Sequence, residues 1–169
     1  MRTRQCALAL AAGLVALWLA PAAVADPAAS GPRVRGEGSG IFLVPPFTGD
    51  RVTIAVDAFG SPSVGTMGTA RGRFEVAHFD KTGGEFARFA GRVTCLAVYG
   101  STAFITGEIE KGHGPDVIGN PVGQAFSITL ADHGQADLAG LAPPSRLAAA
   151  CSPIPLDTVI DQGDYTVTS

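Results

Sequence analysis

The segment RVTCLAVY at residues 92–99 indicates the fold class of this chain. In an extended strand, its apolar side chains occupy both faces, with Val93, Cys95, Ala97 and Tyr99 on one and Leu96 and Val98 on the other. A short run that is apolar on both faces is typical of a central strand covered on both sides. We therefore expect residues 92–99 to form the most buried strand of a β-structured domain.

The segments around this strand alternate between apolar and polar residues, as half-buried strands do. Four of them share this pattern: residues 52–58, 73–78, 103–110 and 125–130. Shorter strands are expected at residues 34–44, 85–89 and 165–168, and glycines fall mostly between the strands. The pattern predicts an all-β fold, either a single antiparallel β-sandwich or a small β-barrel of about seven to nine strands. The one exception is residues 139–150, where a short helix is expected, limited to one or two turns by Pro143 and Pro144.

The N-terminal residues 1–25 have the three parts of a cleavable secretory signal peptide. Arg2 and Arg4 precede an apolar run at residues 7–20, and small residues at Ala23 and Ala25 predict cleavage after Ala25. A membrane anchor is the alternative, but it would need about 20 apolar residues. We expect a flexible N-terminal arm at residues 26–32, a single β-domain at residues 33–169, and a secreted, extracellular protein.

Cleavage would remove Cys6 and leave Cys95 and Cys151 as an even pair in an oxidising compartment. We predict a disulfide between them, closing a loop of 56 residues. By the chain-entropy argument this bond stabilises the fold by about 4 kcal/mol. Two free buried thiols are the alternative, whereas zinc is disfavoured because no further ligands follow at a recognisable spacing.

The charge of the chain disfavours two classes of partner. Loss of Arg2 and Arg4 changes the formal net charge from −3 to −5. A mildly acidic domain with scattered basic residues is not typical of nucleic-acid binding or of docking on anionic lipid. Any partner is expected at the cell envelope or outside the cell. The scarcity of lysine, beside abundant Ala, Gly, Pro and Arg, indicates a GC-rich bacterial genome.

Residues 91–107, GRVTCLAVYGSTAFITG, resemble a motif of secreted bacterial proteins. The segment FSITLADHG at residues 126–134 is similar to the strand and acidic turn that follow it, and QGDYTV at residues 162–167 resembles the terminal strand. The chain thus resembles the post-COAP-1-like, repetin-like secreted β-domains of actinobacteria. It has Ser101 and Asp164 at turn positions where that family favours asparagine. The resemblance implies an extracellular β fold without an established activity, so it assigns no catalytic residue.

The polar motifs give little support for catalysis or metal binding. A hydrolase needs a nucleophile beside a histidine that a carboxylate orients, and His78, His113 and His133 are available. However, no Gly-x-Ser-x-Gly elbow is present, and the serine of GEGSG at residues 36–40 is displaced. Residues 132–137 and 113–116 combine carboxylates with an imidazole, but Asp132 is more simply a turn-forming residue. We therefore expect no catalytic, metal-ligating or cofactor-binding residue, and we assign no role to Glu108 and Glu110.

Nine phenylalanines either pack the core or line a cavity. They are Phe42, Phe47, Phe59, Phe74, Phe79, Phe86, Phe89, Phe104 and Phe126. Small barrels hold one apolar ligand in this way. The sequence thus favours a non-catalytic secreted domain that acts by binding or as a structural module. A carrier of a small apolar ligand and a secreted hydrolase of unknown type are the alternatives.

Overall fold

The computed structural model describes residues 31–61, 70–134, 136–147 and 150–169. The predicted signal peptide at residues 1–25 lies outside the described residues, as does all of the predicted arm except residues 31 and 32. Among the described residues, no helix is long and apolar enough to cross a membrane.

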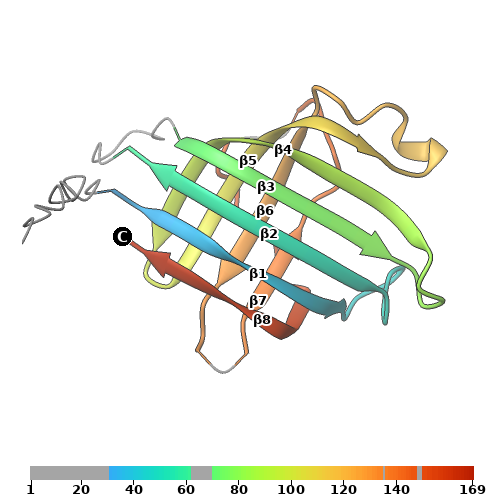
Figure 1. Cartoon of the computed structure of the whole chain (residues 1–169), viewed down its shortest axis with the longest axis horizontal. Helices are drawn as coiled ribbons and strands as arrows, with labels where there is room; N and C mark the ends of the chain where they lie inside the picture. The colour runs from blue at the N-terminus through green and yellow to red at the C-terminus, as the bar shows by residue number, and fades with distance from the viewer. Residues whose placement is uncertain (1–30, 62–69, 135, 148–149) are drawn as a thin grey trace, which may run out of the picture.

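The chain forms a closed barrel of eight antiparallel strands (Figure 1). The strands are β1 (Arg33–Phe42), β2 (Arg51–Gly60), β3 (Ala70–Phe79), β4 (Glu85–Tyr99), β5 (Thr102–His113), β6 (Ala125–Ala131), β7 (Leu138–Leu141) and β8 (Thr158–Thr168). Each strand pairs with the next, and β8 returns to pair with β1, so no sheet edge is left open. The all-β prediction is confirmed, and of the two predicted architectures the chain adopts the barrel and not the sandwich.

The alternating segments place their apolar residues inside the barrel. Val52, Ile54, Val56 and Ala58 of β2 are all buried, and β3 buries Phe74, Val76 and His78 in the same way. The intervening residues on these strands are mostly polar and face the outside. Period-two alternation in the sequence therefore corresponds to the inner and outer faces of one barrel wall.

Tyr165 of β8 fills the middle of the barrel. Its side chain is 1% exposed, and its hydroxyl donates a hydrogen bond to the carbonyl oxygen of Ile54 at 2.8 Å. Gly36 and Gly38 on β1 leave room for the ring, because a Cβ at either position would lie within 3.0 Å of Tyr165 side-chain atoms. The glycines of residues 36–40 thus serve packing of the barrel.

The strand that is covered on both faces is β6, not β4. In β4 only Cys95 and Leu96 are adjacent buried residues, and Tyr99 is 85% exposed. Residues 126–131 of β6 are all buried. The prediction for residues 92–99 was therefore wrong over most of the segment. The strand expected at residues 85–89 and the segment at residues 92–99 form one continuous strand, β4. Gly91 lies between them, and because it has no Cβ, the carbonyl oxygen of Glu108 can approach its backbone.

A long connection between β7 and β8, residues 142–157, explains why β6 is covered. We call it the strap; residues 148 and 149 within it are not described. Its Ser145 exchanges two backbone hydrogen bonds with Ala125, and its Ile154 amide donates to the Thr129 hydroxyl at 2.9 Å. The short helix predicted at residues 139–150 is absent from the described residues, because 138–141 join the barrel as β7 and the strap runs extended or in turns.

The Cys95–Cys151 disulfide fastens the strap to β4, as the cysteine count predicts. The two Cα atoms are 5.5 Å apart and the bond closes 56 residues. Beside it, the Cys151 amide donates to the hydroxyl of Thr106 on β5 at 2.9 Å. The disulfide therefore holds an irregular segment against the outer wall of the barrel.

Candidate functional site

One end of the barrel contains an apolar pocket of about 260 Å³. The ends of β1, β3, β5 and β7 and the starts of β2, β4, β6 and β8 meet at this end, which we call the mouth. Aromatic, aliphatic and proline side chains form most of the lining, including Phe42, Phe47, Phe86, Phe89, Phe126, Val76, Ile118, Leu141, Pro143 and Pro144. Tyr165 and its neighbours fill the barrel below, so the space is confined to the mouth.

His78 supplies a polar group in this apolar lining. Its Nε2 lies 2.8 Å from Oδ2 of Asp50, and both side chains are largely buried, at 11% and 13% exposure. A carboxylate only accepts hydrogen bonds, so Nε2 carries the donated proton. In the neutral ring, Nδ1 is then an acceptor, and among the described residues it has no partner. This acceptor is available to a ligand.

Three phenylalanine rings hold His78 in place. The ring centroids of Phe42, Phe47 and Phe86 lie 5.0, 4.8 and 4.8 Å from that of His78. Phe47 meets the imidazole edge-on, an arrangement that aromatic pairs favour. Because three rings and the Asp50 carboxylate contact the imidazole, His78 holds a fixed position in the lining of the pocket.

Two carboxylates flank the end of β1. The amide of Phe42 donates to the carbonyl oxygen of Asp50 at 3.0 Å, and the amide of Leu43 donates to that of Asp157 at 2.8 Å. Asp157 lines the pocket, and its carboxylate accepts hydrogen bonds from the Thr158 hydroxyl, at 3.0 Å, and from its own backbone amide. Burial raises the pKa of Asp157 above its ordinary value.

None of the described lining residues of the pocket is the Ser, Thr, Cys or Lys that most covalent hydrolytic mechanisms use. The three histidines are also separated. His78 lies inside the mouth, His113 stands on the outer wall beside Glu85, and His133 lies in the β6–β7 turn at the opposite end. The mouth therefore has a histidine and its orienting carboxylate, as a general base requires, but not the third group of a hydrolytic triad.

The acidic turn at residues 132–137 holds the far end of the barrel together. Asp137 is buried and accepts hydrogen bonds from the amides of Tyr165 and His133, at 2.9 and 3.1 Å. Asp132 accepts from the amide of Val167, and its carboxylate has no hydrogen bond to the described residues of its own turn. Burial and the nearby charge of Asp137 raise the pKa of Tyr165. The described residues contain no group of three His, Cys, Asp or Glu side chains that could hold a metal ion.

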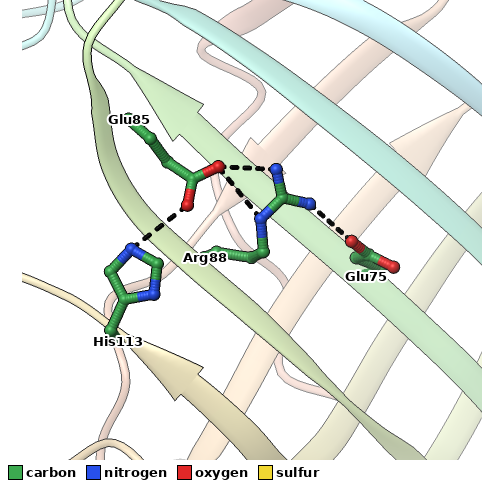
Figure 2. Close-up of polar contacts among 4 residues, drawn as sticks. All are labelled: Glu75, Glu85, Arg88 and His113. Carbon is green, nitrogen blue, oxygen red and sulfur yellow. Dashed lines mark hydrogen bonds and ion pairs between the residues drawn. The ribbon is translucent and has the colours of Figure 1, made fainter.

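The outer wall carries a ladder of charged pairs across β3, β4 and β5. Figure 2 shows Arg88 between Glu75 and Glu85, with Glu85 also contacting His113 at 3.1 Å. The Arg88 guanidinium lowers the pKa of Glu85. These side chains are substantially exposed, so each pair contributes little to stability.

Glu108 and Glu110 belong to the same kind of pairing, with Arg92 and Arg73 respectively. A broad open hollow of about 560 Å³ lies on this wall, lined largely by charged residues such as Glu75 and Arg73. The hollow is open to solvent, and several of its charged residues are already paired across strands. It is a weaker candidate for ligand binding than the mouth.

No protein-family model, curated protein or solved structure matches this chain. The candidate site therefore depends on the geometry of the mouth alone.

Sequence reasoning anticipated part of this site. Phe42, Phe47, Phe86, Phe89 and Phe126 line the pocket, and Phe42, Phe89 and Phe126 are at the same time part of the buried core, as is Phe74. Asp50 and Asp157 were missed because they lie in connections without a strand pattern. A signal for His78 existed, since it continues the inward-facing positions of Phe74 and Val76.

Proposed function

We propose that this chain is a secreted, non-catalytic binding domain that takes one small, largely apolar ligand in the mouth of its barrel. The observation that carries this proposal is the pocket of about 260 Å³, with its phenylalanine-rich lining and the open Nδ1 of His78. Binding sites combine an apolar lining with a few fixed polar groups in this way. The proposal combines two hypotheses from the sequence, namely a non-catalytic binding domain and a carrier of a small apolar ligand.

The size of the pocket limits the ligand. Pockets for drug-sized molecules span about 300–1,000 Å³, and the mouth is smaller than this. A single ring or a short branched chain fits such a space better than a lipid or a fused ring system. One polar group of the ligand would face His78, which the Asp50 carboxylate orients.

Two further features support a domain that works outside the cell. The Cys95–Cys151 disulfide is typical of oxidising compartments, and the sequence of residues 1–25 has the pattern of a signal peptide. The likeness to secreted actinobacterial β-domains agrees with both. A hydrolase is less well supported, because no described lining residue of the pocket is a Ser, Thr, Cys or Lys nucleophile.

Titration with benzyl alcohol tests the proposal, because it is a soluble single-ring compound with a hydroxyl group that can donate to His78. Isothermal titration calorimetry of the mature chain should give saturable binding with a Kd of about 1 mM or tighter, as expected for so small a ligand. Absence of saturation at tenfold that concentration would overturn the proposal.

A matched pair of variants on β4 locates the binding. Ala87 is buried and lines the pocket, whereas Ala90 lies on the outer wall of the same strand. Ala87→Phe should abolish binding because the new ring occupies the pocket, while Ala90→Phe should leave the Kd unchanged. If Ala87→Phe fails to fold by circular dichroism, Leu141→Trp fills the same pocket from β7. Equal binding by the pocket-filling and outer-wall variants would place the ligand elsewhere.

A further inference from the structure

The charged and polar side chains that line the mouth favour a ligand with a positive charge. Among the described lining residues there is no Lys or Arg, and the only titratable side chains are those of His78 and Asp157. The other nearby acid, Asp50, is already hydrogen-bonded to His78. The pocket therefore has an excess of negative charge and no basic side chain to balance Asp157.

Asp157 lacks a cationic partner in this structure. Its carboxylate accepts from the Thr158 hydroxyl, and no described Arg, Lys or His lies within ion-pair distance. By contrast, Asp161 on the following strand, β8, makes two hydrogen bonds of 3.0 Å with Arg51 on the outer wall. A half-buried carboxylate without a counter-charge is costly to ionise, so a cation from outside would interact with it favourably.

His78 adds an acceptor to the same lining. Because its Nε2 donates to Asp50, its Nδ1 accepts in the neutral ring. Both polar side chains of the lining therefore favour a ligand group that donates hydrogen bonds, and the Asp157 carboxylate also favours positive charge. The rings of Phe42, Phe47 and Phe86 beside His78 are compatible with a cation, because the face of an aromatic ring attracts positive charge.

We propose that the ligand of the mouth is a small hydrophobic amine in its protonated form, with its ammonium group at Asp157 and its apolar body among the phenylalanines that surround His78. This inference rests on the proposed function, since it names the ligand class of the same pocket. An anionic ligand is disfavoured because it would face Asp157 without a basic residue, and a neutral ligand would leave that carboxylate unpaired.

Three ligands of nearly equal shape separate these cases. Benzylamine is cationic at pH 7, benzyl alcohol is neutral and benzoate is anionic. Calorimetry at low salt should show benzylamine binding about tenfold more tightly than benzyl alcohol, because a hydrogen bond between charged groups is about twice as strong as a neutral one. Benzoate should bind more weakly than either.

Two asparagine variants test the role of the carboxylate. Asp157→Asn should reduce the preference for benzylamine over benzyl alcohol from about tenfold to less than about threefold. Asp161→Asn removes the same charge from the outer wall and should keep the full preference. The matched substitution therefore separates a local contact from a general effect of net charge.

The outcomes distinguish the two proposals. If none of the three compounds binds, or if Ala87→Phe binds them as the unaltered chain does, the proposed function fails and this inference fails with it. If benzyl alcohol binds in the pocket as tightly as benzylamine, or if Asp157→Asn retains the tenfold preference, only the inference of an amine ligand is overturned. A tenfold preference that Asp157→Asn removes and Asp161→Asn retains supports both.

Discussion

Removal of the Cys95–Cys151 disulfide should cost this barrel a large part of its stability. We consider the double variant Cys95→Ala, Cys151→Ala, which avoids burying a new polar group at position 95. The bond closes a loop of 56 residues, and restricting a loop of this length in the unfolded chain stabilises the fold by about 4 kcal/mol. The total free energy of unfolding of a domain is only about 5–15 kcal/mol, so the effect should be easy to measure.

Urea unfolding followed by far-ultraviolet circular dichroism provides the assay for both forms of the mature chain. The free energy of unfolding extrapolated to water should fall by about 4 kcal/mol in the double variant. Reduction of the unaltered chain should give a similar loss, which serves as the control for packing changes caused by alanine. A loss below about 1 kcal/mol in both experiments would refute the reasoning, because it would show that the strap and its hydrogen bonds hold without the covalent bond.

Three further substitutions test the internal contacts. Tyr165→Phe removes the hydroxyl that bonds the Ile54 carbonyl, so urea unfolding should show a loss of about 1–3 kcal/mol, and no loss would contradict that bond. Asp137→Ala leaves two backbone amides without their acceptor and should cost at least as much, whereas an unchanged midpoint would exclude that role. Burial raises the pKa of Asp157, so its ionisation weakens the fold as the pH rises through that pKa. Asp157→Asn should therefore raise the Tm at pH 7 and leave it unchanged near about pH 3, where the carboxyl is protonated in both states; an equal rise at both pH values would contradict this cause.

The sequence predicted the fold class because the signal for a strand is local. Alternation in residues 52–58 and 73–78 survives in β2 and β3 with the expected inner and outer faces. Closure into a barrel was not predictable in the same way. It depends on β8 pairing with β1 across nearly the whole chain, and on Gly36 and Gly38 leaving space for Tyr165. Neither relation has a local signature.

Two of the differences between prediction and structure have a common physical cause in the strap. Residues 125–130 look half-buried by their alternation, but the strap covers the outer face of β6 and buries both sides. Residues 139–150 contain helix-forming alanines, but pairing of β7 and attachment by Cys151 outweigh that propensity. The candidate site was only partly predictable because Asp50 and Asp157 reach the mouth from connections between strands, which have no periodic pattern.

The most direct test of the ligand site is a two-dimensional ¹H–¹⁵N NMR titration of the mature chain with benzyl alcohol. Binding in the mouth predicts saturable shifts of backbone amides around the pocket, including those of Phe42, Phe86 and Leu141. Amides beside the outer hollow, such as that of Lys111, should not move. Shifts confined to the outer hollow, or the absence of any saturable shift, would contradict a ligand site in the barrel mouth.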